Sequence, residues 1–194
     1  MPRARIAIAA LTLVLAAIAG TLLWITFRGE DTSATVGGPF TLVDETGRTV
    51  TQADFEGSPT VIFFGFTFCP DVCPTTLYEL TLQMQDLGPD ADKADWLFVT
   101  VDPERDTPEA LRQYTSAFDS RIIGLSGTEE QVAAMAKQYF AYYKRVPMEG
   151  GDYTMEHTAT VFLMDSGNEL FGTIGYGEDA GMALSKLRRL LRDG

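Results

Sequence analysis

The chain has 194 residues and is 45% hydrophobic, which is enough for one membrane segment and one globular domain with a real core. Its formal net charge is −12, and because residues 1–28 hold three arginines and no acidic residue, the remainder carries −15. A domain this acidic repels phosphate backbones, so the composition argues against nucleic-acid binding.

The first feature along the chain is an apolar run without any charge at residues 6–27, preceded by Arg3 and Arg5. As a helix this run would span about 33 Å, which matches a hydrocarbon core of roughly 30 Å. A cleaved signal peptide is the alternative, because Ala17-Ile18-Ala19 would serve as a small-residue cleavage site. The chain stays apolar beyond that site, so we favour an uncleaved transmembrane anchor.

The charges around the anchor predict its orientation. Arginines precede it and acidic residues follow it, so the positive-inside rule places residues 1–5 in the bacterial cytoplasm. Residues 28–38 are then a polar tether, and residues 39–194 form a domain in the periplasm, where disulfides persist unless they are reduced.

The domain shows alternating strand and helix patterns. We predict parallel crossovers in the middle of the chain, with helices on both faces of the sheet, and a terminal hairpin that makes the sheet mixed. This is an α/β fold class with the order of an elaborated thioredoxin-like fold. In chain order we predict a hairpin at 40–43 and 48–51, strands at 60–66 and 96–101, helices at 75–87 and 107–118, a strand at 122–125, a helix at 128–142, a hairpin at 158–164 and 169–174, and a helix at 184–191.

The only two cysteines, Cys69 and Cys73, follow the first buried strand and precede the next helix. Pro70 and Pro74 disfavour helical geometry at the residues before them, so we expect the pair on a loop that can vary its sulfur spacing. Such a loop can hold a metal or a reversible disulfide, and the nearby helix N-terminus favours the thiolate. An inert stabilising disulfide is the weaker alternative, since so small a loop removes little unfolded-chain entropy.

The only histidine, His157, is expected at the entrance of the strand at 158–164, beside the exit loop of the first buried strand. Two thiolates and one imidazole suit Cu(I) in three-coordination and tolerate Cu(II), whereas structural zinc usually takes a fourth protein ligand. Met148 and Met155 are possible soft auxiliary ligands, although apolar packing is the more ordinary role for each.

Four stretches of this sequence resemble the SCO/SenC family of copper chaperones for cytochrome c oxidase. The resemblance covers about residues 36–192 and implies a thioredoxin-like fold in which Cys69, Cys73 and His157 bind one copper. It also implies that the two cysteines form a redox-active disulfide. The matching stretches are FFGFTFCPDVCPTT at 63–76, VTVDPERDTPE at 99–109, GLSGTE at 124–129 and EHT at 156–158.

The same resemblance implies partners. The family matures the binuclear copper centre of oxidase subunit II, so we expect that subunit as the target and a periplasmic copper chaperone upstream. Two positions depart from the common family pattern, because Glu156 replaces an Asp and Phe68 replaces a His that could have been a ligand. Asp102 and Asp106 lie in a matched stretch, and we predict structural roles for both.

Three functions remain open from the sequence. The leading hypothesis is a copper-binding assembly factor that is not a turnover enzyme. The second is a dedicated thiol–disulfide oxidoreductase, although general thioredoxins use C-x-x-C and this chain has C-x-x-x-C. A thiol peroxidase is the third, and it is disfavoured because no arginine lies between Arg48 and Arg105 to activate a cysteine.

Overall fold

The computed structural model describes residues 15–21 and 35–194. Residues 15–21 are helical, and no helix among the described residues is long and apolar enough to cross a membrane. The rest of the predicted anchor, the predicted cytoplasmic segment and most of the tether lie outside the described residues. All elements named below belong to one compact unit, Thr35–Gly194.

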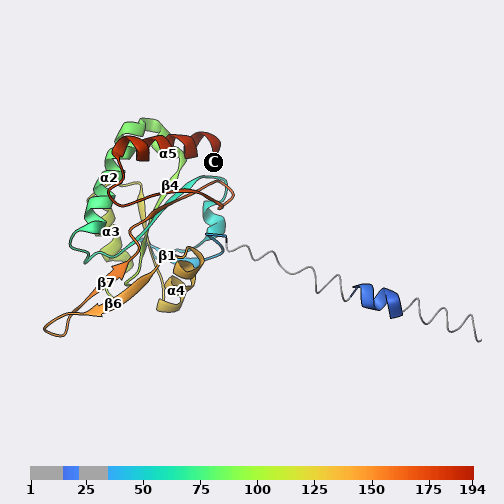
Figure 1. The fold of residues 1–194 in the computed structure, drawn as a ribbon. Coiled ribbons are helices and arrows are strands. Elements are labelled where there is room, and N and C mark those ends of the chain that lie inside the picture. The colour runs from blue at the N-terminus through green and yellow to red at the C-terminus, as the bar shows by residue number, and fades with distance from the viewer. Residues whose placement is uncertain (1–14, 22–34) are drawn as a thin grey trace, which may run out of the picture. The chain divides into compact units, whose positions relative to one another are not determined.

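A seven-stranded mixed sheet forms the centre of this unit, with strand order β2-β1-β5-β4-β3-β8-β9 (Figure 1). Strands β3, β4 and β5 are parallel, while β8 and β9 on one side and β1 and β2 on the other run antiparallel to their neighbours. The predicted α/β fold with a mixed sheet is therefore confirmed. The strands are β1 (Thr41–Asp44), β2 (Thr49–Thr51), β3 (Thr60–Gly65), β4 (Asp95–Thr100), β5 (Ile122–Ser126), β8 (Val161–Met164) and β9 (Leu170–Ile174).

Strand β3 is an interior strand of the sheet, next to the central β4, and every one of its residues is buried. It pairs in parallel with β4 and antiparallel with β8, so both of its edges are hydrogen-bonded. Its aromatic side chains pack into the core, where Phe64 lies edge-on to Phe162 with ring centroids 5.9 Å apart. The carboxyl end of β3 is therefore a rigid base for the cysteine segment that follows it.

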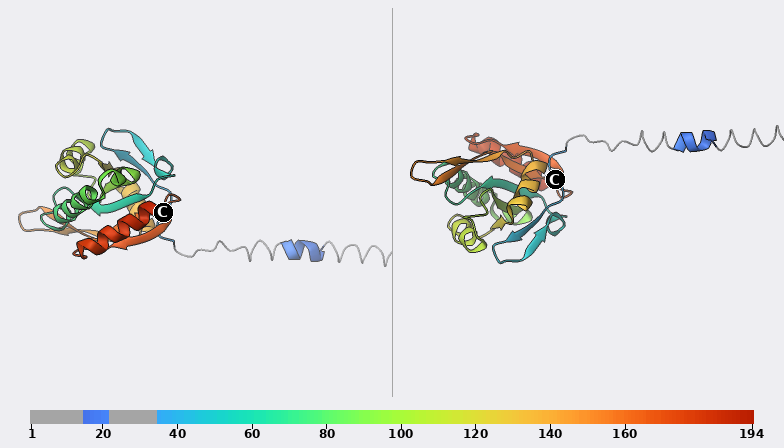
Figure 2. Two further views of the ribbon diagram at one scale, coloured as in Figure 1. Left: turned by 90° about the horizontal axis from the view of Figure 1, so that it is seen from above. Right: turned by 90° about the horizontal axis from the view of Figure 1, so that it is seen from below.

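Helices lie on both faces of the sheet. Figure 2 shows α2 and α5 in front when the unit is seen from above, and α4 in front when it is seen from below. Side chains cap two of the helices: Thr107 accepts a hydrogen bond from the Ala110 N–H, and Thr128 forms a capping box with Gln131. The helices are α2 (Val72–Leu87), α3 (Pro108–Ser116), α4 (Glu129–Gln138) and α5 (Ala180–Asp193), with 3₁₀ turns η1 (Gln52–Phe55) and η2 (Gly88–Lys93).

The predicted helix at 128–142 is too long, because α4 ends at Gln138. Phe140 adopts a left-handed backbone with φ of 52°, and the N–H of Ala141 donates to the carbonyl of Ala136 over 2.8 Å. This closing bond is that of a Schellman motif, which turns the chain out of the helix.

A third hairpin, which the sequence patterns do not predict, follows α4. Strands β6 (Tyr143–Pro147) and β7 (Tyr153–His157) pair antiparallel as a sheet of their own, separate from the seven-stranded sheet. The predicted strand at 158–164 is correspondingly shorter, since β8 begins at Val161. Figure 1 shows the β6–β7 hairpin extending from the body of the unit.

Candidate metal centre

The cysteine segment connects β3 to α2. We expected both cysteines on a loop with the helix starting after them, but α2 begins at Val72, which places Cys73 in its first turn. Pro74 is compatible with this position because the first N–H groups of a helix have no intrahelical partner, so a missing one costs nothing. Only Cys69 therefore lies on the loop.

Cys73 is fully buried beneath the end of β3. A β-carbon on Gly65 would lie 2.9 Å from the Cys73 sulfur and 2.6 Å from a ring carbon of Phe98. Contacts this short do not occur between real side chains, so only glycine at position 65 leaves room for the sulfur. Cys69 is half-buried at the surface, and its Sγ accepts a hydrogen bond from the Cys73 N–H at 3.3 Å.

A buried carboxylate holds the start of the cysteine segment. Asp106 accepts hydrogen bonds from the Thr67 N–H at 3.0 Å, the Thr67 hydroxyl at 2.6 Å and the Thr100 hydroxyl at 2.6 Å. Burial raises the pKa of Asp106, and these hydrogen bonds oppose the rise. The predicted structural role of Asp106 is thus confirmed, and it consists of tying the cysteine segment to the end of β4.

His157 is supplied to the site by β7, a different element from the one that carries the cysteines. It is the last residue of β7. The sequence places it on the loop that enters the strand at 158–164, so this expected position is wrong by one element. The expected neighbourhood is confirmed, because β8 pairs antiparallel with β3 through Val161 and Phe63, and the turn from β7 into β8 therefore lies beside the exit of β3.

The hydrogen bonds of the imidazole define which nitrogen is free. Nδ1 lies 2.9 Å from the carbonyl oxygen of Thr158, and since a carbonyl only accepts, Nδ1 carries the hydrogen. Nε2 then has its lone pair directed at the Cys73 Sγ, 3.2 Å away. The rings of Phe63 and Phe66 pack edge-on to the imidazole at 6.1 and 5.8 Å, which restrains its orientation.

The two thiols have opposite acidities. The hydrogen bond from the Cys73 thiol lowers the pKa of Cys69 to about 4, against the opposing effect of burial. The same hydrogen bond raises the pKa of Cys73, as do its burial and the negative charge on Cys69. Cys69 is therefore a thiolate at neutral pH, while Cys73 holds the shared proton.

The three donor atoms converge closely enough for one metal ion. The sulfurs of Cys69 and Cys73 and a ring nitrogen of His157 all lie within 4.8 Å of one another. Metal–sulfur and metal–nitrogen bonds of about 2.0–2.3 Å place donors up to about 4.6 Å apart, so small movements suffice. A metal would displace the shared proton, and two sulfurs with one imidazole suit copper.

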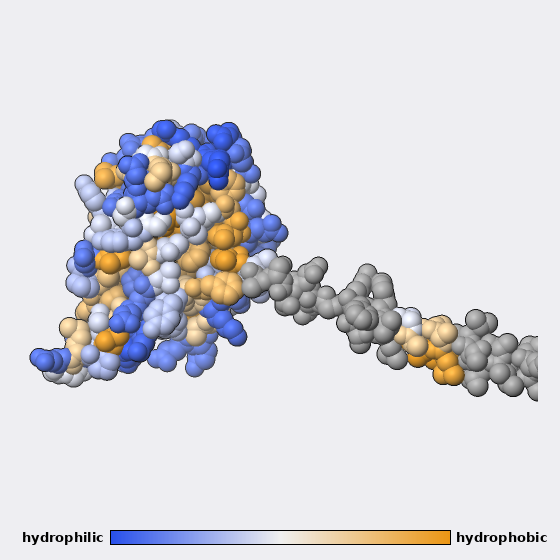
Figure 3. All heavy atoms as spheres, in the orientation of Figure 1, coloured by the Kyte–Doolittle hydropathy of each residue, from blue (hydrophilic) through white to orange (hydrophobic). Residues whose placement is uncertain are grey.

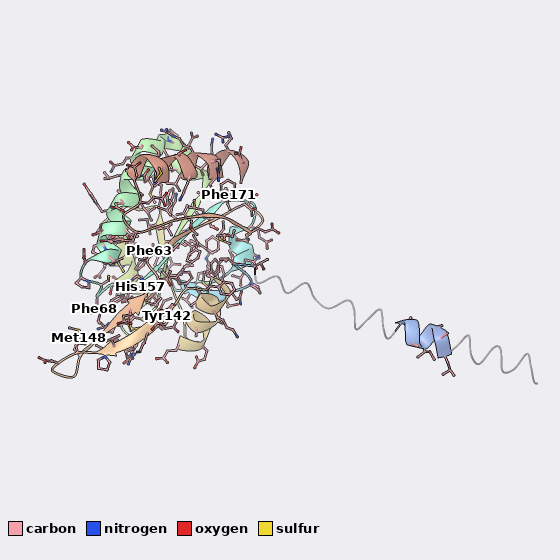
Figure 4. All side chains as sticks on the ribbon, viewed as in Figure 1. Phe63, Phe68, Tyr142, Met148, His157 and Phe171 are labelled. Carbon is pink, nitrogen blue, oxygen red and sulfur yellow. The ribbon has the colours of Figure 1, made fainter. Side chains whose placement is uncertain are left out.

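Among the other residues considered from the sequence, Met155 and Glu156 line the same surface cavity as Cys69 and His157. Met155 is buried on β7, while Met148 is exposed and lies toward the far end of the hairpin (Figure 4). Glu156 is exposed and pairs across the hairpin with Lys144. Phe68 is also exposed, at 62%.

Comparison with known proteins identifies the family. A family model described as SCO1/SenC matches residues 28–192. The chain belongs to the SCO1/SenC family. It is 36% identical over 163 residues to Saccharomyces cerevisiae protein SCO2, mitochondrial, covering 82% of this chain and 54% of that protein. It is 40% identical over 134 residues to Rhodobacter capsulatus protein SenC, covering 69% and 60%. The chain thus spans little more than half the length of these relatives.

Among solved structures, copper-bound ScoI from Bradyrhizobium japonicum is similar with a TM-score of 0.75 and 44% identity. The match covers 80% of this chain and 99% of that one. The thioredoxin-like fold that the sequence predicts is confirmed by this likeness.

Two groups of supporting residues were missed from the sequence. The space that Gly65 leaves for a sulfur has no signal in a single sequence. The β6–β7 hairpin did have one, because Gly150-Gly151 forms a turn signal between two short segments rich in β-branched and aromatic residues.

Proposed function

We propose that this chain is a copper-binding assembly factor that holds one copper through Cys69, Cys73 and His157. It delivers that copper to, or prepares the cysteines of, the binuclear copper centre of cytochrome c oxidase subunit II. The observation that carries the proposal is the convergence of two sulfurs and one free imidazole nitrogen within 4.8 Å. The similarity to a copper-bound ScoI supports the choice of metal.

The surface around the site suits exchange with a protein partner. Cys69 is only half-buried, so a second dithiol can reach the metal and take it by ligand exchange. Exposed apolar side chains surround this region, among them Phe68 and Tyr142. Figure 3 shows apolar surface between the hydrophilic helices and the hydrophilic hairpin tip, and Figure 4 shows both side chains on the His157 side of the unit.

The location follows from the sequence. We propose that residues 6–27 anchor the chain in a bacterial inner membrane and that residues 39–194 work in the periplasm. There the domain would receive copper from an upstream chaperone and meet the membrane-bound oxidase subunit. Recovery of the full chain in the membrane fraction, with the domain accessible to protease in spheroplasts, would support this arrangement.

A second function is supported by the acidity of the thiols. A thiolate at Cys69 beside the protonated Cys73 is the arrangement of a dithiol reductant. Cys69 would attack a partner disulfide, and Cys73 would then attack the mixed disulfide. The chain would lose two electrons and the one proton held by Cys73 as its own disulfide forms, and the partner dithiol would be released with that proton and a second one from solvent.

The test is titration of the reduced chain with copper in the presence of a competing chelator. We expect one copper per chain, and affinity at least tenfold weaker in Cys69→Ala, Cys73→Ala and His157→Ala. Met148→Leu is the matched control for a soft side chain outside the site and should bind copper normally. Undiminished binding by His157→Ala would refute the three-ligand site.

The same variants separate delivery from reduction. With the soluble domain of subunit II as acceptor, His157→Ala should transfer copper poorly yet reduce the acceptor disulfide at nearly the normal rate. Loss of disulfide reduction in every cysteine variant, with no copper transfer from the unmodified chain, would favour the reductase.

A further inference from the structure

The β6–β7 hairpin, which carries His157, has no backbone hydrogen bonds to the seven-stranded sheet along its strands. Side chains attach it to the body instead: Met155 is buried in the core, Phe63 and Phe66 pack on His157, and the turn after β4 supplies polar contacts. The Tyr153 hydroxyl donates to the buried Asp102 carboxylate at 2.9 Å, and Arg145 forms an ion pair with Glu104. The position of His157 therefore depends on contacts made by residues 102–105.

Arg105 makes the largest share of these contacts. Its Nη1 donates to the carbonyl oxygen of Tyr153 at 3.0 Å, and its guanidinium lies 3.8 Å from the centre of the Tyr153 ring. Its Nε pairs with Asp102, which also accepts from Tyr153. The Arg105 side chain is only 17% exposed, so these interactions are shielded from water. They are therefore stronger than the same interactions would be at an exposed surface.

Arg105 also contacts the cysteine segment. Its guanidinium lies 4.6 Å from the centre of the Phe68 ring, immediately before Cys69, and 5.9 Å from that of Phe66. The next residue, Asp106, binds both the N–H and the hydroxyl of Thr67. One short turn thus touches both halves of the metal centre.

We propose that Arg105 is a positioning residue of the metal centre, packed between the Phe68 and Tyr153 rings so that the hairpin bearing His157 is held against the cysteine segment. The inference rests on the proposed function, because it assigns Arg105 a role at the copper site. That Arg105 holds the hairpin against the cysteine segment can be tested without copper. No ligand bond is assigned to Arg105, since a guanidinium has no free lone pair.

The first test uses the metal-free full chain and measures amide hydrogen exchange. In Arg105→Met, which keeps an unbranched side chain, we expect amides of β6 and β7 to exchange at least tenfold faster, with little change in β3 and β4. Arg112→Met is the matched control, because Arg112 also pairs with an acidic residue three positions earlier, Glu109, but on the exposed surface of α3. The control should leave hairpin exchange unchanged.

The second test loads the same variants with Cu(II) and records nitrogen hyperfine coupling alongside affinity. We expect Arg105→Met to bind copper 10- to 100-fold more weakly and to show weakened or heterogeneous coupling from the His157 nitrogen. A merely stabilising role would lower the unfolding midpoint and leave that coupling intact.

Arg105→Lys covers the case in which the methionine variant does not fold. Lysine keeps the charge beside Asp102 but cannot reproduce a planar guanidinium between two rings, so faster hairpin exchange should persist. The inference would be overturned if both variants showed the hairpin exchange and the nitrogen coupling of the unmodified chain. If only the lysine variant folds, the same result in that variant alone would overturn it. Failure of the unmodified chain to bind copper would instead overturn the proposed function, and hairpin exchange would still decide the role of Arg105.

Discussion

The two halves of the metal centre are supported in different ways. The cysteine half continues directly from β3, a fully buried strand with paired neighbours on both edges, into the first turn of α2. The histidine half lies at the end of a two-stranded hairpin that packs on the body through side chains. The dithiol should therefore share the stability of the whole domain, whereas the position of the imidazole can change through local opening of the hairpin.

This difference would suit the proposed function, in which the protein both holds and releases copper. A dithiol fixed by the core gives a constant capture geometry, and a third ligand on a separate hairpin can withdraw at low cost when an acceptor approaches. Four measurements test whether the two halves of the site differ in this way.

Asp106→Ala should have the largest effect, because it attacks the support of the cysteine half. The substitution leaves donors of Thr67 and Thr100 buried without their acceptor. We expect the free energy of unfolding to fall by roughly 3 kcal/mol, measured by urea denaturation. Asp90→Ala, at an exposed carboxylate, is the control. If Asp106→Ala left the free energy of unfolding unchanged and only accelerated amide exchange in the β6–β7 hairpin, the assignment of Asp106 to the cysteine half would be wrong.

The pH dependence of Cys69 alkylation should show the next largest effect. With its pKa near 4, Cys69 is fully ionised above about pH 6, so its alkylation rate should stay flat between pH 6 and 9. An ordinary thiol with a pKa of about 8.5 would speed up by roughly two orders of magnitude over that range. Cys73→Ala, which leaves no side-chain donor at this position, should restore much of the rise, because the Cys73 hydrogen bond is the largest cause of the lowered pKa. A rising rate in the unmodified chain would contradict the thiolate.

Gly65→Ala tests the space beneath the cysteine half. Its new methyl would overlap the Cys73 sulfur and the Phe98 ring, so we expect a loss of about 2 kcal/mol in the free energy of unfolding together with weaker copper binding. Gly172→Ala on β9 is the matched control, since its β-carbon would meet no atom within 4 Å. Equal stability of the two variants would show that the Cys73 sulfur and the Phe98 ring can move aside without cost.

Tyr153→Phe should have the smallest effect, since it removes one hydrogen bond from the histidine half and keeps the ring beneath Arg105. We expect a global change of no more than about 1 kcal/mol, with a clearer increase in hydrogen exchange at β7. A global loss as large as that of Asp106→Ala would mean that the hairpin is part of the cooperative core.

The two halves also differ in how well the sequence predicts them. The cysteine half was located from local signals, namely a buried apolar run followed by C-x-x-x-C at a strand-to-helix junction. The error there was the start of α2, because the avoidance of helix before proline is weaker in a first turn, where Pro74 loses no hydrogen bond.

The histidine half could not be derived from local pattern alone. A lone histidine gives no spacing to analyse, and its pairing with Cys73 depends on how β8 meets β3. The family resemblance supplied His157, but the hairpin that carries it and the contacts of Arg105 depend on three-dimensional packing. Sequence motifs therefore point to the candidate ligands more fully than to the residues that position them.

The antiparallel pairing of β8 with β3 has a consequence for the order in which the site forms. Cys73 and His157 are 84 residues apart, and in the folded domain the pairing of Thr60–Phe63 with Val161–Met164 brings them together. Contacts of such long range close late, because the loop entropy must be overcome first. A chain emerging during synthesis carries its dithiol long before its imidazole, so copper capture by the three proposed ligands would mark a domain that has finished folding.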